Sequence, residues 1–207
     1  MLKIYIARHG QDEDNANGIL NGHRDTKLTP TGEQQALDLA LAINSPRLKF
    51  DAVYYSPLRR AKNTASIILI EIGHIGVQCS ANPLLIERDF GVMTGKPVKD
   101  IYLLCEPDVI KTDTITYFLS PEGAETFPQL MERGRLLLTE IRSLWSDGNV
   151  LLVTHGDIGK MIYAAYYGLD WKDVLTMFHF GNSELLLLSE DCRPEDAHLV
   201  RIEQFNH

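Results

Sequence analysis

Short apolar runs alternate along the chain with longer segments in which apolar side chains recur at helical spacing. The runs are rich in β-branched and aromatic residues and end at glycine or polar turn residues, a pattern typical of buried strands. They occupy residues 2–7, 50–55 and 150–153. The pattern therefore predicts strands that are separated by helices.

Cap residues and breakers set the expected helix boundaries. Thr29, Pro30 and Glu33 supply a hydroxyl cap, a proline in the first turn and an acidic side chain near the positive end of the helix dipole. Ser56 and Pro57 give a second start of the same kind. The expected helices begin near residues 29, 56, 121 and 157 and end near residues 45, 73, 146 and 168.

The segment between residues 82 and 120 is less regular. Pro83, Pro97 and Pro107 interrupt it, so we expect a loop, one short helix near residues 98–104 and an irregular excursion. Residues 88–120 are the predicted lid or substrate-side region. Further strands are expected at residues 77–79, 184–189 and 199–205, the last as an edge strand because it alternates apolar and polar positions.

Strands that alternate with helices indicate an α/β fold. We expect a three-layer α/β/α sandwich with a mainly parallel central sheet. Residues 1–207 contain no internal repeat and no Gly/Ser-rich linker, so a single domain is predicted. In such sheets ligands bind beyond the carboxyl ends of the strands.

Composition narrows the class of protein. Of the 207 residues, 44% are hydrophobic and 23% are charged, which excludes a disordered chain. No run approaches the ~18 apolar residues of a membrane span, and the first apolar run ends at Arg8, too early for a signal peptide. The three cysteines, Cys79, Cys105 and Cys192, are widely spaced, which favours a reducing compartment. A cytoplasmic protein is expected.

The net charge of −8 bears on partners. An acidic surface repels nucleic acid and anionic lipid, so neither is expected to bind. An anionic substrate would need a local cluster of basic groups. The sequence leaves the oligomeric state open, a homo-oligomer included.

Two histidines follow predicted strands. His9 lies between Arg8 and Gly10 after the first strand, and His155 precedes Gly156 after the strand at residues 150–153. Because the carboxyl ends of parallel strands gather at one edge, the two imidazoles should converge there. A single loop histidine is more often a solvated or hydrogen-bonding residue, but two at equivalent positions favour a site. No third ligand lies at metal-binding spacing from either, so no metal is expected.

Other candidates are weaker by themselves. Arg59 and Arg60 follow a predicted strand at a helix start, where phosphate binds well and where free cations are unfavourable. Glu87 lies in a mixed-charge stretch that resembles an ordinary surface turn. Residues 11–21 could cradle an anion through side chains and amides, although a flexible loop is the simpler interpretation.

Several short segments occur in order between residues 4 and 156. They are Arg8-His9-Gly10 with Asn15, residues 28–36, Ser56-Pro57-Leu58-Arg59-Arg60-Ala61 with Thr64-Ala65, Glu87 with Phe90-Gly91, residues 121–126, and His155-Gly156. Together they resemble the histidine phosphatase superfamily, in its phosphoglycerate mutase-like branch. Arg-His-Gly alone would be a weak signal, but several motifs in the same order seldom match by accident.

The resemblance implies roles for individual residues. His9 would be the nucleophile that becomes phosphohistidine, and Glu87 the proton donor. Arg8, Arg60 and His155 would clamp the phosphoryl group, Arg60 being chosen over Arg59 because the family's phosphate-binding arginine directly precedes an alanine. The positions matching substrate-contacting residues are Asn15, Asn21, Gly22 and Gly156.

Physical chemistry fits these roles without a cofactor. A phosphoryl group in transfer spreads negative charge over its oxygens, which guanidinium groups can stabilise without a metal. Neighbouring cations should lower the pKa of His9 below ~6.5 and keep its imidazole neutral and nucleophilic. Glu87 should have a raised pKa if it donates a proton at neutral pH.

The expected function is a metal-independent phosphatase of a small phosphorylated metabolite. The chain departs from many family members at Gln11, where they have Glu, and at residues 93–95, where they have Trp-Glu-Gly. Two alternatives remain. One is a cofactor-dependent phosphoglycerate mutase, although the excursion beyond Arg88 offers only Lys96, Lys99 and Lys111 as basic residues. The other is a catalytically silent module that binds a phosphorylated ligand.

Overall fold

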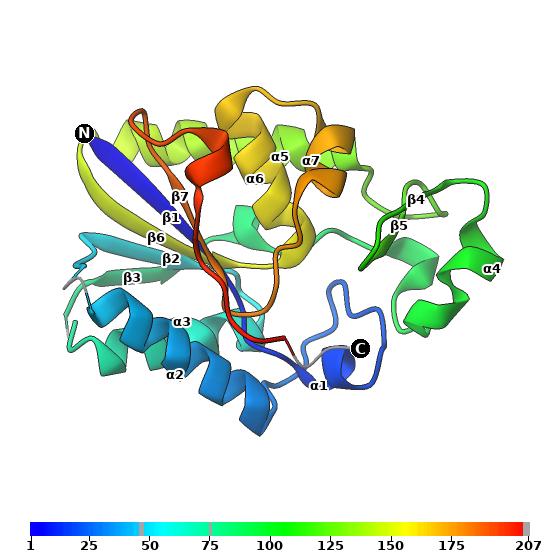
Figure 1. The fold of residues 1–207 in the computed structure, drawn as a ribbon, viewed down its shortest axis with the longest axis horizontal. Helices are drawn as coiled ribbons and strands as arrows, with labels where there is room; N and C mark the ends of the chain where they lie inside the picture. Colours follow the sequence, from blue (N-terminus) through cyan, green and yellow to red (C-terminus); the bar gives the residue numbers. More distant parts are fainter. Residues whose placement is uncertain (46–47, 75, 205–207) are drawn as a thin grey trace.

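A six-stranded sheet forms the middle layer of the fold (Figure 1). The computed structural model describes residues 1–45, 48–74 and 76–204. The strand order is β3-β2-β6-β1-β7-β8. The strands are β1 (Leu2–Arg8), β2 (Ala52–Tyr55), β3 (Gln78–Ala81), β6 (Gly148–Thr154), β7 (Leu185–Leu188) and β8 (His198–Val200). The first four in this order are parallel, and β7 and β8 run antiparallel to their neighbours.

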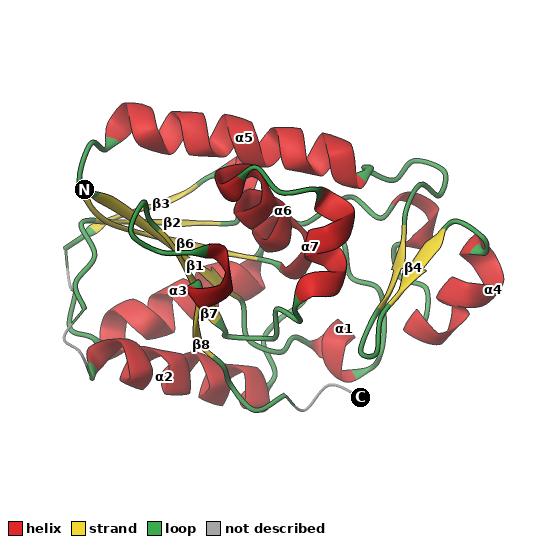
Figure 2. Ribbon diagram, turned by 45° about the horizontal axis from the view of Figure 1, so that its top comes forward, coloured by secondary structure: helices red, strands yellow, loops and turns green. Residues whose placement is uncertain are grey.

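Helices cover both faces of the sheet (Figures 1 and 2). Helices α2 (Pro30–Asn44) and α3 (Arg59–Glu71) pack on one face. Helices α5 (Phe127–Leu144), α6 (Gly156–Tyr167) and α7 (Trp171–Met177) pack on the other. Each interface is a separate core of buried apolar side chains, so the sheet is shielded from water on both sides. The three-layer α/β/α prediction is confirmed.

Capping explains where two of the long helices begin. The Thr29 side chain accepts a hydrogen bond from the Gly32 amide at the start of α2, as predicted. Helix α5 begins at Phe127 rather than near residue 121, because Gly123 adopts φ +73° and breaks the helical path. Thr126 and Gln129 then form a reciprocal capping box.

The irregular excursion has its own small core. It contains the short helix α4 (Ile101–Cys105), which agrees with the prediction, and a hairpin of β4 (Val109–Lys111) and β5 (Thr116–Phe118), which was not predicted. Strands of three residues carry too little alternation to be recognised in a sequence. The buried side chains of this third core are Leu20, Phe90, Met93, Ile101, Cys105 and Phe118.

Three further segments differ from the predictions. Helix α1 (Glu13–Ala16) lies in the predicted loop, and α7 was not expected. The edge strand β8 ends at Val200, whereas the prediction extended to residue 205, which lies outside the described residues. Residues 201–204 form no strand. The side-chain amide of Gln204 exchanges two hydrogen bonds with the backbone of Asn182.

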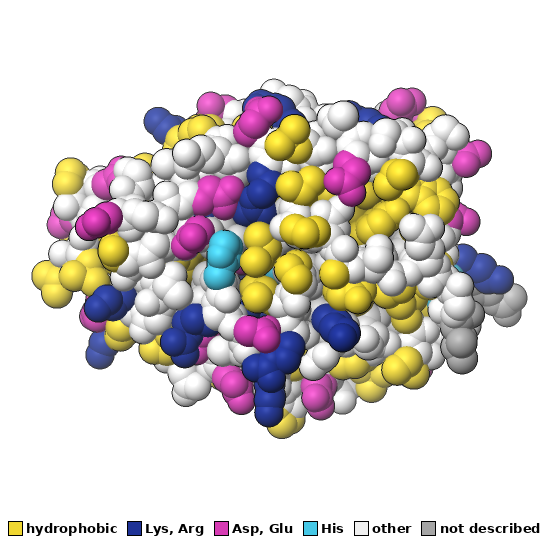
Figure 3. All heavy atoms as spheres, turned by 180° about the vertical axis from the view of Figure 1, so that it is seen from behind, with side chains coloured by type: hydrophobic (Ala, Val, Ile, Leu, Met, Phe, Trp, Pro, Cys, Tyr) yellow, Lys and Arg dark blue, Asp and Glu magenta, His cyan; other side chains and the backbone are white. Residues whose placement is uncertain are grey.

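The surface carries both signs of charge. On the face in Figure 3, acidic and basic side chains are intermingled and do not gather into one basic patch. Within the described residues, no helix combines the length and the apolar character needed to cross a bilayer.

Candidate active site

Three adjacent strands deliver the predicted site residues to one edge of the sheet. Arg8 ends β1 and His9 follows it, while His155 follows β6 in the next strand position. The register places Arg8 opposite Thr154, so the two histidines leave the sheet side by side. Their ring centroids are 4.9 Å apart. The predicted convergence of two distant imidazoles is therefore present.

The hydrogen bonds of His9 fix which ring nitrogen carries the proton. Its Nδ1 lies 2.7 Å from the carbonyl oxygen of Gly10, which can only accept, so Nδ1 is protonated. In the neutral ring Nε2 then keeps its lone pair, and the Nε of Arg60 lies 3.3 Å away as a donor. The side chain is almost fully buried. His9 thus presents an unprotonated nitrogen to the site.

His155 is held by partners on both sides of its ring. Its Nδ1 lies 3.2 Å from Nε of Arg60, which donates, and its Nε2 lies 2.7 Å from Oγ of Ser56. Ser56 follows β2, so all three neighbouring parallel strands contribute to the site. Ser56 was expected to cap α3, but α3 begins at Arg59 with no side-chain cap from Leu58.

Burial and positive charge act together on both imidazoles. Burial is the main cause that lowers the pKa of His9 well below 6.5, and Arg60 and Arg8 lower it further. The pKa of His155 is lowered for the same reasons, with burial again first and Arg60 second. The direction agrees with the sequence-based expectation, although desolvation contributes more than the neighbouring cations. Both rings are neutral near pH 7 in the free protein.

Arg60 is fully buried, and its Nε lies within hydrogen-bonding distance of both histidine rings. Its Nη1 donates to the carbonyl of Arg24 at 2.6 Å and its Nη2 to that of Gly22 at 2.8 Å. Its Nε lies 3.2 Å from a carboxylate oxygen of Asp12. Each Nη carries a second N–H, so the guanidinium can still donate to an anion.

Arg59 points away from this cluster. Its backbone amide and its Nε donate to the carboxylate of Asp25 at 2.7 and 2.9 Å, in an exposed position. Asp25 therefore supplies the N-terminal hydrogen bond that α3 lacks from Leu58. This carboxylate also explains why a basic pair is tolerated at a helix start.

Arg8 has one donor without a partner. Its Nη1 donates to the carbonyl of Phe180 at 2.6 Å, whereas its buried Nε has no hydrogen-bond partner among the described residues. Gly156 lies against this guanidinium, and a Cβ there would stand 3.6 Å from Cζ of Arg8. A buried N–H donor without a partner lowers the stability of the folded protein, unless a ligand accepts its hydrogen bond.

Glu87 is buried beside the first turn of α6. Its Oε1 accepts hydrogen bonds from the amides of Arg88 at 2.8 Å and Ile158 at 3.2 Å. Burial raises its pKa and the charge of Asp157 raises it further, which outweighs the lowering by these amides and by Arg60. The carboxyl group can therefore hold a proton at a higher pH than an exposed glutamate.

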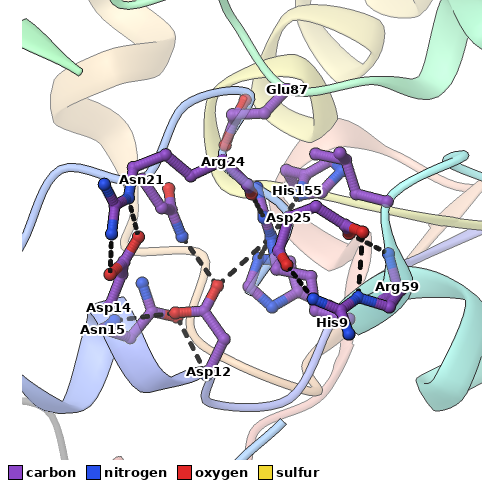
Figure 4. Close-up of polar contacts among 12 residues, drawn as sticks. His9, Asp12, Asp14, Asn15, Asn21, Arg24, Asp25, Arg59, Glu87 and His155 are labelled. Atoms are coloured by element: carbon purple, nitrogen blue, oxygen red, sulfur yellow. Dashed lines mark hydrogen bonds and ion pairs between the residues drawn. The ribbon is translucent and has the colours of Figure 1, made fainter. Parts of the chain in front are cut away.

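The loop after His9 is ordered by hydrogen bonds rather than open. Asn21 donates from Nδ2 to Asp12 at 2.8 Å, and Oδ1 of Asn15 accepts from Asn182 at 3.2 Å. Gly22, at φ +48°, contributes the carbonyl that Arg60 contacts. These predicted substrate-binding positions lie in the cluster, and the two asparagine side chains are engaged within the protein (Figure 4).

Sequence analysis missed three members of this cluster. Asp12 is fully buried and its carboxylate caps α1, a role that the pattern Asp12-x-x-Asn15 could have indicated. Ser56 was assigned to a helix cap. Asn182 donates from Nδ2 to the carbonyl of His9 at 3.0 Å, and no local pattern links these two positions.

The cluster can bind and react with a tetrahedral anion. Two guanidinium groups offer donors, one neutral imidazole offers a nucleophilic nitrogen, and a buried carboxyl group with a raised pKa lies close by. Such sets stabilise charge that develops on phosphoryl oxygens.

Comparisons with known proteins agree with this chemistry. A model of the histidine phosphatase superfamily (branch 1) matches residues 4–202. A 2,3-bisphosphoglycerate-dependent phosphoglycerate mutase of Parvibaculum lavamentivorans is 32% identical over 176 residues, 84% of each chain. A broad-specificity phosphatase of Saccharomyces cerevisiae is 37% identical over 100 residues, 48% of this chain and 44% of the relative. A mycobacterial glucosyl-3-phosphoglycerate phosphatase structure superposes with a TM-score of 0.76 at 24% identity, covering 90% of this chain and 92% of that one.

Proposed function

The chain belongs to the histidine phosphatase superfamily, and on this basis we propose that it is a phosphomonoesterase that hydrolyses a small phosphorylated metabolite through a phosphohistidine at His9. One observation carries the proposal. The unprotonated Nε2 of His9 lies beside Arg60, in a buried site where Arg8 keeps an unpaired donor. The proposed nucleophile and the proposed donors for the phosphoryl oxygens therefore belong to one buried cluster.

In the first half of the reaction, Nε2 of His9 attacks the phosphorus atom and an N–P bond forms. The bond between phosphorus and the ester oxygen breaks, and Glu87 gives its proton to the leaving oxygen. Arg8 and Arg60 neutralise the charge on the phosphoryl oxygens. The proton stays on Nδ1, which donates it in a hydrogen bond to the carbonyl of Gly10, so the imidazole is held in the reactive tautomer.

In the second half, a water molecule attacks the phosphohistidine. An O–P bond forms, the N–P bond breaks, and the carboxylate of Glu87 accepts the proton from water. Orthophosphate leaves, and His9 and Glu87 regain their starting states. A raised pKa suits Glu87 to both steps, because it must give and take a proton near neutral pH.

The 32% identical relative, a phosphoglycerate mutase, supports the mutase alternative. A mutase must hold the carboxylate of a phosphoglycerate beside the phosphoryl site. The basic side chains that the excursion offers, Lys96, Lys99 and Lys111, are all exposed. The two activities separate in one assay, since a mutase isomerises 3-phosphoglycerate faster than it releases phosphate.

The test is hydrolysis of p-nitrophenyl phosphate in EDTA by the wild type and His9→Ala. We expect the variant to lose at least about 10³-fold in kcat, because covalent catalysis needs the nucleophile. The control is His74→Ala, since His74 contacts Phe50 away from the cluster. The wild type should also yield an acid-labile phosphoenzyme. Undiminished turnover in His9→Ala would refute the mechanism. A wild type that binds phosphate without hydrolysing an ester would support the alternative of a catalytically silent, phospholigand-binding module.

Three sequence-based expectations remain predictions beside this proposal. They are a single domain over residues 1–207, a lid or substrate-side role for residues 88–120, and a cytoplasmic location. The partner that the proposal requires is a small phosphorylated molecule.

A further inference from the structure

A cavity of about 310 Å³ lies between the β4–β5 turn and the segment that follows α7. Residues 111–114 and Tyr117 line it on the hairpin side, and Thr176, Phe178 and His179 line it on the other. In Figures 1 and 2 the hairpin lies beside α7, beyond the carboxyl end of the sheet. The volume falls in the range of small-molecule sites.

The cavity adjoins the phosphoryl cluster on the side of Arg8. His179 directly precedes Phe180, whose carbonyl accepts the hydrogen bond from Nη1 of Arg8 at 2.6 Å. Arg8 also acts electrostatically on both His179 and Tyr117, and Glu87 acts on Tyr117. These contacts place the cavity on the Arg8 side of the cluster.

His179 is one of the residues that line the cavity. Its Nδ1 is buried and has no hydrogen-bond partner among the described residues. Burial first, and then Arg8, lower its pKa to about 4, so the ring is neutral at physiological pH. The ring of a neutral histidine can pair with a hydroxyl group as donor or acceptor.

The charges around the cavity nearly cancel. Lys111 and Asp113 carry opposite charges on the same turn. The buried Lys160 is not available to an anion, because its Nζ already donates to the hydroxyl of Tyr117 at 3.2 Å and to the carbonyls of Leu175 and Phe178 at 2.8 and 2.5 Å. An ammonium group has three donors, and all three are used.

We propose that this cavity is the leaving-group subsite, and that it takes the uncharged, polyhydroxylated part of a sugar or polyol phosphate. The inference rests on the proposed phosphomonoesterase function and narrows its substrate class. Hydroxyl groups of Thr114 and Thr176 and the imidazole of His179 supply hydrogen-bond partners, while the rings of Tyr117 and Phe178 supply apolar surface. Among the described residues that line the cavity, Lys111 at the exposed rim is the only cation that a carboxylate could meet.

The kinetic test compares glucose 6-phosphate, 3-phosphoglycerate and p-nitrophenyl phosphate. We expect the wild type to have a kcat/KM for glucose 6-phosphate at least about tenfold above that for 3-phosphoglycerate. In His179→Ala, the ratio of kcat/KM for glucose 6-phosphate to that for p-nitrophenyl phosphate should fall about tenfold, the effect of one hydrogen bond. An unchanged ratio, or a preference for 3-phosphoglycerate, would overturn the inference.

Thr114→Ala is a second variant, at an exposed turn position where folding is not at risk. The ratio should fall in it by about threefold, whereas Thr139→Ala, on the exposed side of α5, is the matched control and should leave it unchanged.

A binding measurement separates failure of the subsite from failure of the proposed function. In the His9→Ala background, glucose 6-phosphate should bind about tenfold more tightly than inorganic phosphate by titration calorimetry, and His9→Ala/His179→Ala should lose this difference. If the wild type hydrolyses p-nitrophenyl phosphate but shows no such difference, the subsite is wrong and the phosphatase stands. If the difference is present without turnover of any ester, the subsite stands and the phosphatase is wrong.

Discussion

Oδ2 of Asp12 lies 3.2 Å from Nε of Arg60, and both side chains are fully buried. The same Nε also faces His9 and His155 at 3.3 and 3.2 Å, so three acceptors surround one N–H. The carboxylate balances a guanidinium that would otherwise be an unpaired charge in the protein interior. It also holds this guanidinium in place before a phosphoryl group arrives, which reduces the reorganisation that binding requires.

Replacing this carboxylate should cost stability that phosphate can restore. We expect Asp12→Asn to lower the free energy of unfolding by about 3–5 kcal/mol, because it leaves the charge of Arg60 unpaired. Inorganic phosphate should raise the melting temperature of the variant more than that of the wild type, since it supplies the missing anion. Thermal unfolding with and without phosphate measures both effects. Asp38→Asn, at an exposed position on α2, is the control, and equal phosphate shifts in all three proteins would contradict the expectation.

The fold was predictable where the chain repeats a simple pattern. The buried strands β1, β2 and β6 have apolar runs of their own, and α2 has a cap that can be recognised locally. The β4–β5 hairpin and α7 lack such signals, because short elements derive their stability from packing against distant residues. Gly123 shows the same limit, since its left-handed backbone moves the start of α5 to Phe127.

Adjacent arginines give a matched pair of variants. Arg60→Lys keeps the positive charge but loses the fork that reaches Asp12, Gly22 and a phosphoryl group, so kcat/KM should fall about 10²-fold or more. Arg59→Lys changes an exposed pair with Asp25, and its kcat/KM should stay within about threefold of the wild type. Steady-state kinetics with p-nitrophenyl phosphate measure both. Similar losses in the two variants would mean that Arg60 has no special role.

The role of Glu87 can be tested through the leaving group. In Glu87→Gln, kcat for an alkyl phosphate should fall by about 10²–10⁴, because its alkoxide must be protonated as it leaves. The loss should be much smaller for p-nitrophenyl phosphate, whose leaving group needs no proton. Asp157 is near Glu87, so Asp157→Asn is a useful comparison that should lower the pKa of Glu87 but keep its carboxyl group.

The pH profile provides the second readout for Glu87. For the alkyl phosphate, the wild-type kcat/KM, which reports the free enzyme, should decline as the pH rises through the raised pKa of Glu87, because the proton is then lost before reaction. It should decline at acidic pH only below the lowered pKa of His9, where the nucleophile becomes protonated. The alkaline decline should be absent in Glu87→Gln. An identical profile in both proteins would assign that decline to another group.

The site was predictable from the sequence as far as strand topology and family motifs extend. Arg8, His9 and His155 follow recognisable strands, so their meeting could be deduced from topology. Asn182 could not be found in this way, because its contact with the carbonyl of His9 depends on the path of the chain between α7 and β7. The carboxylate of Asp12 was overlooked because burial, which gives it its importance, is a property of the folded chain.

Because of Lys160, the free energy of unfolding should depend on pH in the alkaline range. Burial lowers its pKa to about 8 in the folded protein, below the ordinary value of 10.5. Between these two values the unfolded chain binds more protons, so the free energy of unfolding should rise with pH there. Relative to Lys160→Met, the wild type should gain at most about 3 kcal/mol across this window, at roughly 1.4 kcal/mol per pKa unit.

Chemical denaturation at pH 7.5 and pH 10 measures this difference. Lys172→Met, at an exposed position on α7, is the control and should keep a constant offset from the wild type. A constant offset for Lys160→Met as well would show that Lys160 is solvated in the folded state.

The bond between Asn182 and the carbonyl of His9 joins positions that are 173 residues apart. His155 and β6 are also made late, long after β1 has left the peptidyl transferase centre. During translation His9 therefore exists for most of the synthesis time without Asn182 and His155. A nascent chain that stops before residue 182 lacks the donor to the carbonyl of His9, so prematurely terminated products should lack the proposed activity.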